Sequence, residues 1–251
     1  MAGHLKAIGY FHRVRTGKHP IADIPRVMLM VRGLRRANGP TQRNLPATVE
    51  DLGTLKGLLD LGQVGQQILW TSVLLGWVFM LRMGEFLDAK NPLTPDGRRP
   101  VLISDIDPLC DGKSTRWGKH VDEVMVHISG SQTDWLNQGC VWSHIRLATG
   151  SANQDICAAR AIADLFTMFP AKFSKNRDAP LATWRNGGAI RPGHVTAKLR
   201  SAVTKNGENP SAYSIHSLRA GGATALYRET KEIALAARFG RWKTGSISAY
   251  L

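Results

Sequence analysis

The fold is decided by one C-terminal stretch, His216-Ser-Leu-Arg219-Ala-Gly-Gly-Ala-Thr-Ala-Leu226, which is followed by Gly240-Arg-Trp242 and by Tyr250. A histidine and an arginine three residues apart lie on one face of a helix. A guanidinium binds phosphate oxygens through paired hydrogen bonds, an indole N–H is a donor only, and an activated tyrosine hydroxyl is a nucleophile. The stretch therefore contains the groups that attack a phosphodiester and stabilise its charge, which indicates DNA strand breakage and rejoining.

A second arginine motif, Arg82-Met-Gly-Glu85, stands far upstream at the end of the apolar run 68–81. The run is too short to span a bilayer, and it predicts part of a buried helix over 64–89 with a break near Gly84. Taken singly, Arg-x-x-Glu and His-x-x-Arg are common pairs on solvated helix faces, and a tryptophan is more often part of a core. Their joint order and spacing favour one shared site.

The remaining sequence predicts a mainly α-helical chain with a small antiparallel β-sheet, an α+β fold. Thr48 as an N-cap, with Asp51 three residues later, predicts the start of a helix. Hydrophobic periodicity predicts further elements: helices over 22–37, 48–60, 153–168, 192–206, 216–228 and 230–239, and strands over 101–106, 123–129 and 140–145. The last two strands are expected to form a hairpin.

Two glycines, Gly221 and Gly222, fall inside the predicted helix that carries Arg219. Each costs about 1 kcal/mol relative to alanine in a helix interior. We expect a close backbone approach at this point, either to another helix or to DNA.

The chain is strongly basic, with 33 Lys and Arg residues against 19 acidic residues, a formal net charge of +14. Nine of the basic residues and only two acidic ones lie within residues 1–50. A cationic surface binds polyanions because it releases their condensed counterions. The charge therefore favours nucleic acid as the partner over a lipid surface or a merely soluble basic face.

The motifs Arg82-x-x-Glu85, His216-x-x-Arg219, Gly240-Arg-Trp242 and Tyr250 resemble those of the tyrosine recombinases, or integrases. The sequence of residues 211–251 is most similar to those of recombinases from eukaryotic DIRS-type and Crypton-like mobile elements. The resemblance implies a tyrosine recombinase catalytic domain over 48–251 and a linker over 38–47. Residues 1–37 are then the remnant of a helical core-binding domain, and we expect the chain to be a fragment.

The resemblance also implies a role for each motif residue. Tyr250 is the nucleophile that forms a 3′-phosphotyrosyl bond, Arg82 and Arg219 hold the phosphate oxygens, His216 assists proton transfer, and Trp242 donates a hydrogen bond. Neither a metal nor another cofactor is implied. The implied partners are double-stranded DNA and further copies of the chain, assembled as a tetramer on two DNA sites. Candidate DNA-contacting residues are Arg32, Arg35, Arg36, Arg43, Arg241 and Lys243.

One position departs from the family pattern. Its members carry a lysine in the hairpin turn that protonates the leaving 5′-oxygen, whereas this chain has Gln132 within Ser131-Gln-Thr-Asp134. A neutral amide is no general acid. Lys113 and Lys119 in the preceding loop are candidate substitutes, although nothing in the sequence places them at the site. Three functions therefore stay open for the chain: an active recombinase, a catalytically inactive DNA-binding relative, and a type IB topoisomerase, which uses similar residues.

The three cysteines, Cys110, Cys140 and Cys157, are widely spaced and predict neither a disulfide framework nor a zinc site. The N-terminal residues lack the apolar core of a signal peptide. We expect an intracellular protein without a membrane span, and the resemblance to eukaryotic elements implies the nucleus.

Overall fold

The computed structural model describes residues 2–17, 44–87, 99–115, 117, 118, 120–130, 138–242 and 247, together with residues 26, 29, 30, 33, 34 and 37. The chain consists of two compact units, Met1–Arg43 and Asn44–Leu251. None of the described helices is long and apolar enough to cross a membrane.

The first unit contains helix α1, Ala2–Thr16, which the sequence pattern does not predict. Tyr10, Phe11 and Val14 of this helix are all exposed. Within the predicted helix 22–37, the six described residues are helical, and the rest of the range lies outside the described residues.

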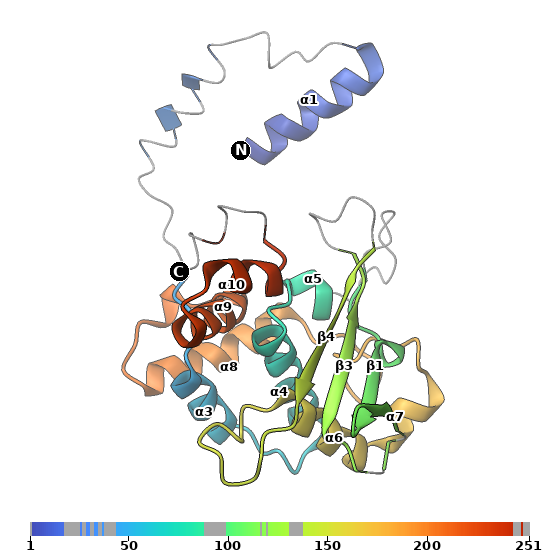
Figure 1. Ribbon diagram of the computed structural model, residues 1–251. Helices are drawn as coiled ribbons and strands as arrows, with labels where there is room; N and C mark the ends of the chain where they lie inside the picture. Colours follow the sequence, from blue (N-terminus) through green and yellow to red (C-terminus); the bar gives the residue numbers. More distant parts are fainter. Residues whose placement is uncertain are drawn as a thin grey trace. The chain divides into compact units, whose positions relative to one another are not determined.

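The second unit is mainly α-helical with one small sheet, which confirms the predicted class (Figure 1). Its α-helices are α3 (Val49–Gly57), α4 (Val64–Val78), α5 (Met83–Phe86), α6 (Ala158–Met168), α7 (Pro170–Lys175), α8 (Pro192–Lys205), α9 (His216–Thr230) and α10 (Ile233–Phe239). Short 3-10 turns cover Ile103–Asp105 and Pro210–Ala212. The strands are β1 (Ile106–Cys110), β2 (Lys113–Ser114), β3 (Glu123–Ile128) and β4 (Cys140–Ile145).

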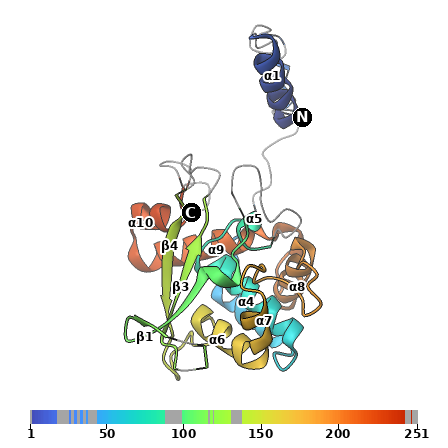
Figure 2. The same cartoon turned by 90° about the vertical axis from the view of Figure 1, so that its right-hand side faces the viewer.

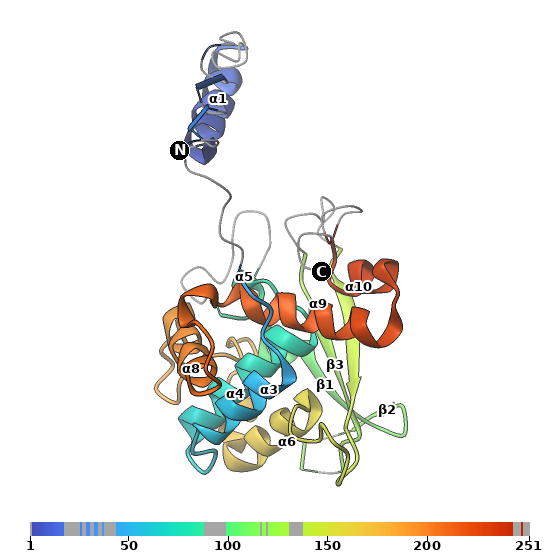
Figure 3. The same cartoon turned by 90° about the vertical axis from the view of Figure 1, so that its left-hand side faces the viewer.

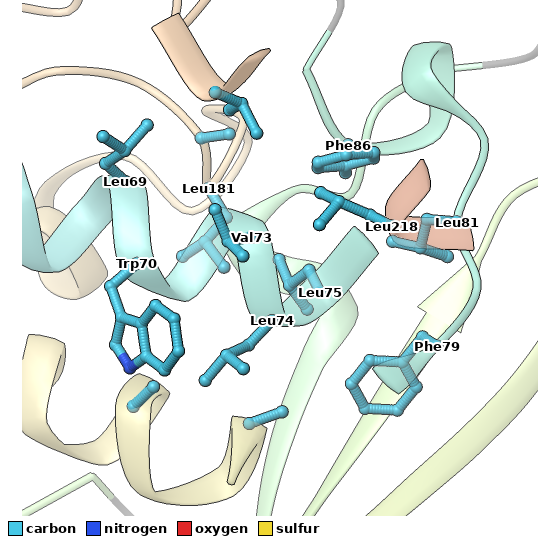
Figure 4. Close-up of a cluster of buried hydrophobic side chains, with 14 of the residues drawn as sticks. Leu69, Trp70, Val73, Leu74, Leu75, Phe79, Leu81, Phe86, Leu181 and Leu218 are labelled. Carbon is cyan, nitrogen blue, oxygen red and sulfur yellow. The ribbon is translucent and has the colours of Figure 1, made fainter. Parts of the chain in front are cut away.

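Helix α4 forms the centre of the hydrophobic core. Every residue from Gln67 to Gly76 is buried, as expected for a helix that is apolar around its whole circumference. It packs against α6 on one side and α9 on another. Figure 4 shows its side chains Trp70 and Val73 among the cluster, with Leu218 of α9 reaching the same core.

The sheet lies beside the helices with strand order β2-β1-β3-β4, and all neighbouring strands are antiparallel. In β3 the buried residues Val124, Val126 and Ile128 alternate with half-buried ones. Trp142 of the edge strand β4 pairs with Val126, and its ring stacks on Phe239 of α10 at a centroid distance of 4.4 Å. Figures 2 and 3 show α10 beside β4 at this edge.

Four predicted elements are wrong in their bounds. The helices expected over 153–168 and 230–239 begin late, at Ala158 and at Ile233, the second because Lys231 is left-handed. The strand expected over 101–106 begins only at Ile106, because the Asp105 carboxylate binds the Leu102 backbone N–H and the Arg99 guanidinium and turns the chain there. The long helix ends at Val78, well before Gly84, and Arg82 begins a separate short helix. Arg82 therefore does not lie at the end of the apolar helix.

The approach expected at Gly221 and Gly222 is to other parts of the protein. A Cβ atom at Gly221 would lie closer than 3.0 Å to the Ala47 carbonyl, and one at Gly222 equally close to the Trp77 carbonyl. Both obstacles are backbone, and the Trp77 indole N–H donates to the Ala47 carbonyl at 3.0 Å. The two glycines thus allow α9 to pack directly on the end of α4 and on the chain entering α3.

We predict that Gly221→Ala lowers the free energy of unfolding by about 2–3 kcal/mol, because overpacking forces a backbone shift. The matched control is Gly53→Ala in α3, where an added Cβ meets nothing within 4 Å. That change should stabilise the protein by roughly 0.5–1 kcal/mol through helix propensity. Urea unfolding of both variants measures the difference, and equal stabilities would contradict the assigned packing.

Candidate active site

Arg219 lies in the first turn of α9 and is only 3% exposed. Its two terminal nitrogens donate to the carbonyl oxygens of Met80 and Gly240, which belong to segments far apart in the chain. The guanidinium also lies over the ring of Trp242, 4.1 Å from its centroid. Cation–π attraction and carbonyl acceptors stabilise a buried cation without cancelling its charge.

Arg82 is held by the short helix that it precedes. Its backbone N–H donates to Glu85 Oε2 at 2.7 Å, and its Nη1 donates to Glu85 Oε1 at 3.0 Å. Its Nη2 donates to the Arg241 carbonyl at 3.1 Å. The side chain is 20% exposed, so the guanidinium is fixed in place while part of its surface reaches solvent.

Glu85 binds two arginines with one carboxylate. Besides Arg82, it accepts from Arg241 Nη2 at 2.5 Å, and its side chain is 9% exposed. Arg241 in turn lies 3.3 Å from the Met80 carbonyl, which also accepts from Arg219. Two guanidinium groups therefore bind one carboxylate, and the third, that of Arg219, shares the Met80 carbonyl with Arg241. Among the described residues in contact here, the cations outnumber the carboxylates, which suits an anion.

Two residues of the site have left-handed backbone conformations. Met80 has φ +48° and Arg241 has φ +58°. Such angles are uncommon outside glycine, and they cluster at functional sites because tertiary contacts must hold them. Here these conformations occur in the two segments whose carbonyl groups accept the arginine hydrogen bonds.

The structure brings together Arg82, Arg219, Arg241 and Trp242 among the predicted site residues. His216 is exposed at the first position of α9, one helical turn before the buried Arg219. The other predicted site residues lie outside the described residues, and their roles stay predictions: Tyr250, Gln132, Arg32, Arg35, Arg36, Arg43 and Lys243. Lys119 is also outside them, while Lys113 lies exposed on β2.

The sequence motifs miss two features of the site. The carbonyl groups of Met80 and Gly240 carry no side-chain signal, so no pattern identifies them. Cys140 at the start of β4 lies near the arginines: burial raises the pKa of its thiol, and the Arg241 guanidinium opposes that rise. On the same strand, burial lowers the pKa of His144, whose ring lies 6.3 Å from that of Phe79.

One group among the described residues has metal-ligating atoms close together. The Cys110 thiol and the carboxylates of Asp111 and Asp122 lie within 4.8 Å of one another, where the β1–β2 turn meets the start of β3. All three are exposed or half-buried, and the Asp111 backbone N–H already binds Asp122 Oδ2. Exposed acidic groups are common without a metal, so this group indicates no metal function.

The fold of this chain is similar to that of the XerH site-specific recombinase, solved bound to its difH substrate as a pre-cleavage complex. The TM-score is 0.51 at 14% sequence identity, and the match covers 82% of this chain and 49% of XerH. The chain thus spans about half the length of that recombinase. The predicted tyrosine recombinase catalytic-domain fold is confirmed. No protein-family model and no curated protein matches the sequence.

We predict that Glu85→Gln lowers the free energy of unfolding by roughly 2–4 kcal/mol, because it removes the carboxylate that pairs with two largely buried guanidinium groups. The control is Glu229→Gln on the exposed face of α9, which should change stability by less than about 0.5 kcal/mol. Chemical denaturation compares the two. A Glu85→Gln protein as stable as the control would show that the carboxylate does not hold the cluster.

Proposed function

We propose that this chain is a site-specific tyrosine recombinase domain, which binds double-stranded DNA and exchanges its strands. The observation that carries the proposal is the meeting of Arg82 and Arg219 at the Met80 and Gly240–Arg241 backbone, from motifs more than a hundred residues apart. The fold similarity to a recombinase solved with its DNA substrate supports it. The formal net charge of +14 fits a polyanionic partner.

In the proposed reaction the Tyr250 hydroxyl attacks the scissile phosphorus. A bond forms between the phenolic oxygen and phosphorus, while the bond to the 5′-oxygen breaks and that oxygen takes up a proton. The two guanidinium groups bind the non-bridging oxygens, where negative charge accumulates in the transition state. Attack by a 5′-hydroxyl on the 3′-phosphotyrosyl bond reverses the steps and rejoins the strand, so no metal or nucleotide is required.

The excess of cations over carboxylates suits this chemistry. One terminal nitrogen of the Arg82 guanidinium binds Glu85, and the other binds the Arg241 carbonyl. Part of the side chain is exposed, so a phosphate can reach the guanidinium. Arg219 donates to the carbonyl oxygens of Met80 and Gly240 and lies over the Trp242 ring. An arginine keeps its proton in such surroundings, so its charge remains available to a phosphate.

The wider setting belongs to the same proposal. The resemblance to DIRS-type and Crypton-like recombinases suggests a mobile element that integrates into or leaves host DNA in the nucleus. Strand exchange needs two DNA duplexes, so we propose that four copies of the complete protein act together on two sites.

A second candidate is a DNA-binding relative that does not cleave. Gln132 in place of the family's lysine favours it, because an amide cannot protonate the leaving oxygen. The fold and the cationic site serve binding equally well in this case.

A duplex with a nick beside the scissile phosphate separates the two candidates, because loss of the short leaving strand traps the covalent product. We predict a protein–DNA adduct that disappears in Tyr250→Phe and in Arg219→Ala, and that Tyr227→Phe, on α9, retains. Arg219→Ala should still bind the duplex, since other cationic residues contact phosphates. Denaturing gels and filter binding measure both. Salt-dependent binding without any adduct would favour the binding module.

We further predict that Gln132→Lys raises the cleavage rate by roughly 10²–10⁴-fold, the usual contribution of a general acid. Gln132→Arg is the matched control, because a guanidinium supplies the charge yet does not lose its proton in proteins. Single-turnover cleavage of the nicked duplex measures the rates. An unchanged rate in Gln132→Lys would mean that another residue protonates the leaving oxygen.

A further inference from the structure

We infer that Arg241 is a positioning residue, which locks the 240–242 turn against the Arg82 segment and so sets the geometry of both phosphate-binding arginines. This inference rests on the function proposed above, and it assigns Arg241 to the protein interior in place of a DNA contact. Three groups of contacts support it.

The first is a closed ring of polar contacts. Arg82 Nη1 donates to Glu85 Oε1 at 3.0 Å, and Glu85 Oε2 accepts from Arg241 Nη2 at 2.5 Å. The Arg241 carbonyl then accepts from Arg82 Nη2 at 3.1 Å. The side chain and the carbonyl of Arg241 thus bind the two ends of one Arg82–Glu85 pair. Arg82 cannot keep this orientation if the 240–242 turn moves away.

The second group attaches the same side chain to the end of α4. Arg241 Nη1 lies 3.4 Å from the Phe79 carbonyl, and Nη2 lies 3.3 Å from the Met80 carbonyl. The Met80 oxygen also accepts from Arg219, so Arg241 and Arg219 share an acceptor. The Arg241 side chain is 11% exposed, half as much as that of Arg82. These contacts direct its guanidinium into the protein.

The third group connects the turn to Arg219. The Arg241 backbone is left-handed, with φ +58°, and the preceding Gly240 carbonyl accepts from Arg219. The Trp242 ring folds back so closely that a Cβ atom on Gly240 would collide with it. From there the ring covers the Arg219 guanidinium at 4.1 Å. Fixing Arg241 therefore fixes the acceptor and the aromatic face that hold Arg219.

An arginine is required for this arrangement because its planar fork reaches several acceptors at once. Its contacts include two backbone carbonyls and one carboxylate oxygen, from three residues of two separate turns. A lysine ammonium keeps the charge on a single flexible point and does not reproduce the fork. Charge and geometry are thus separable by substitution.

The pKa of the Cys140 thiol can be measured without DNA, and it shows whether the Arg241 guanidinium lies beside that thiol. Burial raises the pKa of the Cys140 thiol, and the neighbouring Arg241 guanidinium opposes that rise. The pH dependence of alkylation gives the thiol pKa independently of accessibility, which changes only the limiting rate. Cys157 is buried, and Cys110→Ser removes the other half-buried thiol from every protein compared.

The experiment compares Arg241→Gln, Arg241→Lys and Glu85→Gln with the control Arg238→Gln, which removes an exposed charge from α10 one turn earlier. Iodoacetamide kinetics give the Cys140 pKa, and salt titrations give the affinity and salt slope for duplex DNA. The nicked duplex gives the adduct rate at saturating DNA. Urea unfolding of the single variants and of Glu85→Gln/Arg241→Gln tests whether the two residues act as a pair.

We expect the Cys140 pKa to rise in Arg241→Gln and to stay unchanged in Arg238→Gln. The adduct rate should fall roughly 10–100-fold in both Arg241 variants, the usual cost of a misplaced reacting group, while affinity stays within about threefold of wild type. The unfolding effects of Glu85→Gln and Arg241→Gln should be non-additive because the residues are in contact.

Three results would overturn the inference. One is a salt slope that falls by about one in Arg241→Gln alone, which marks a direct phosphate contact. Another is full adduct formation by Arg241→Lys, which shows that charge suffices. The third is an unchanged Cys140 pKa together with additive unfolding effects. If the wild-type protein forms no adduct, the proposed enzyme fails, and the thiol pKa and the unfolding cycle still decide the position of Arg241.

Discussion

The arrangement of the site depends on one backbone oxygen, the carbonyl of Met80. It accepts hydrogen bonds from Arg219 of α9 and from Arg241 beyond α10, and thereby joins two segments that the chain keeps far apart. The oxygen points to the arginines because α4 ends at Val78 and Met80 takes a left-handed conformation. A guanidinium buried without acceptors would be strongly destabilising, so this turn and the arginines are stable only together.

The choice of cation distinguishes the site from the rest of the interior. Lys172 of α7 is also buried, and its ammonium donates to the Thr183 carbonyl and hydroxyl. Burial lowers the pKa of Lys172 to about 8, so this ammonium is mostly charged at pH 7 but loses its proton at a far lower pH than a solvated lysine does. Arginine stays protonated in comparable surroundings. A buried anion site built from arginines therefore retains its charge, whereas lysines in the same positions would lose part of theirs.

Local signals predicted much of the fold, and tertiary contacts account for some of the errors. The capping box of Thr48 and Asp51 begins α3 where the sequence placed it, since its signal lies within one helical turn. The apolar run 68–81 gave no sign that the helix ends at Val78, because the arginines that hold the following turn come from distant segments. The displaced start of β1 has a different, local cause, the Arg99–Asp105 ion pair between residues six positions apart.

The sequence predicted which residues form the site, but it did not predict how their side chains are arranged. Motif order and spacing predicted that Arg82, Arg219 and Trp242 share one site. The same motifs predicted that Arg241 contacts DNA, because an arginine at the end of a helix is usually solvated. What decides its position is the depth of α9. Gly221 lets α9 contact the Ala47 carbonyl directly, and that contact places Arg219, two residues earlier, deep enough to reach Met80. At this depth Arg219 meets the Gly240 carbonyl and the Trp242 ring of the 240–242 turn, while the Arg241 side chain of the same turn lies against Glu85.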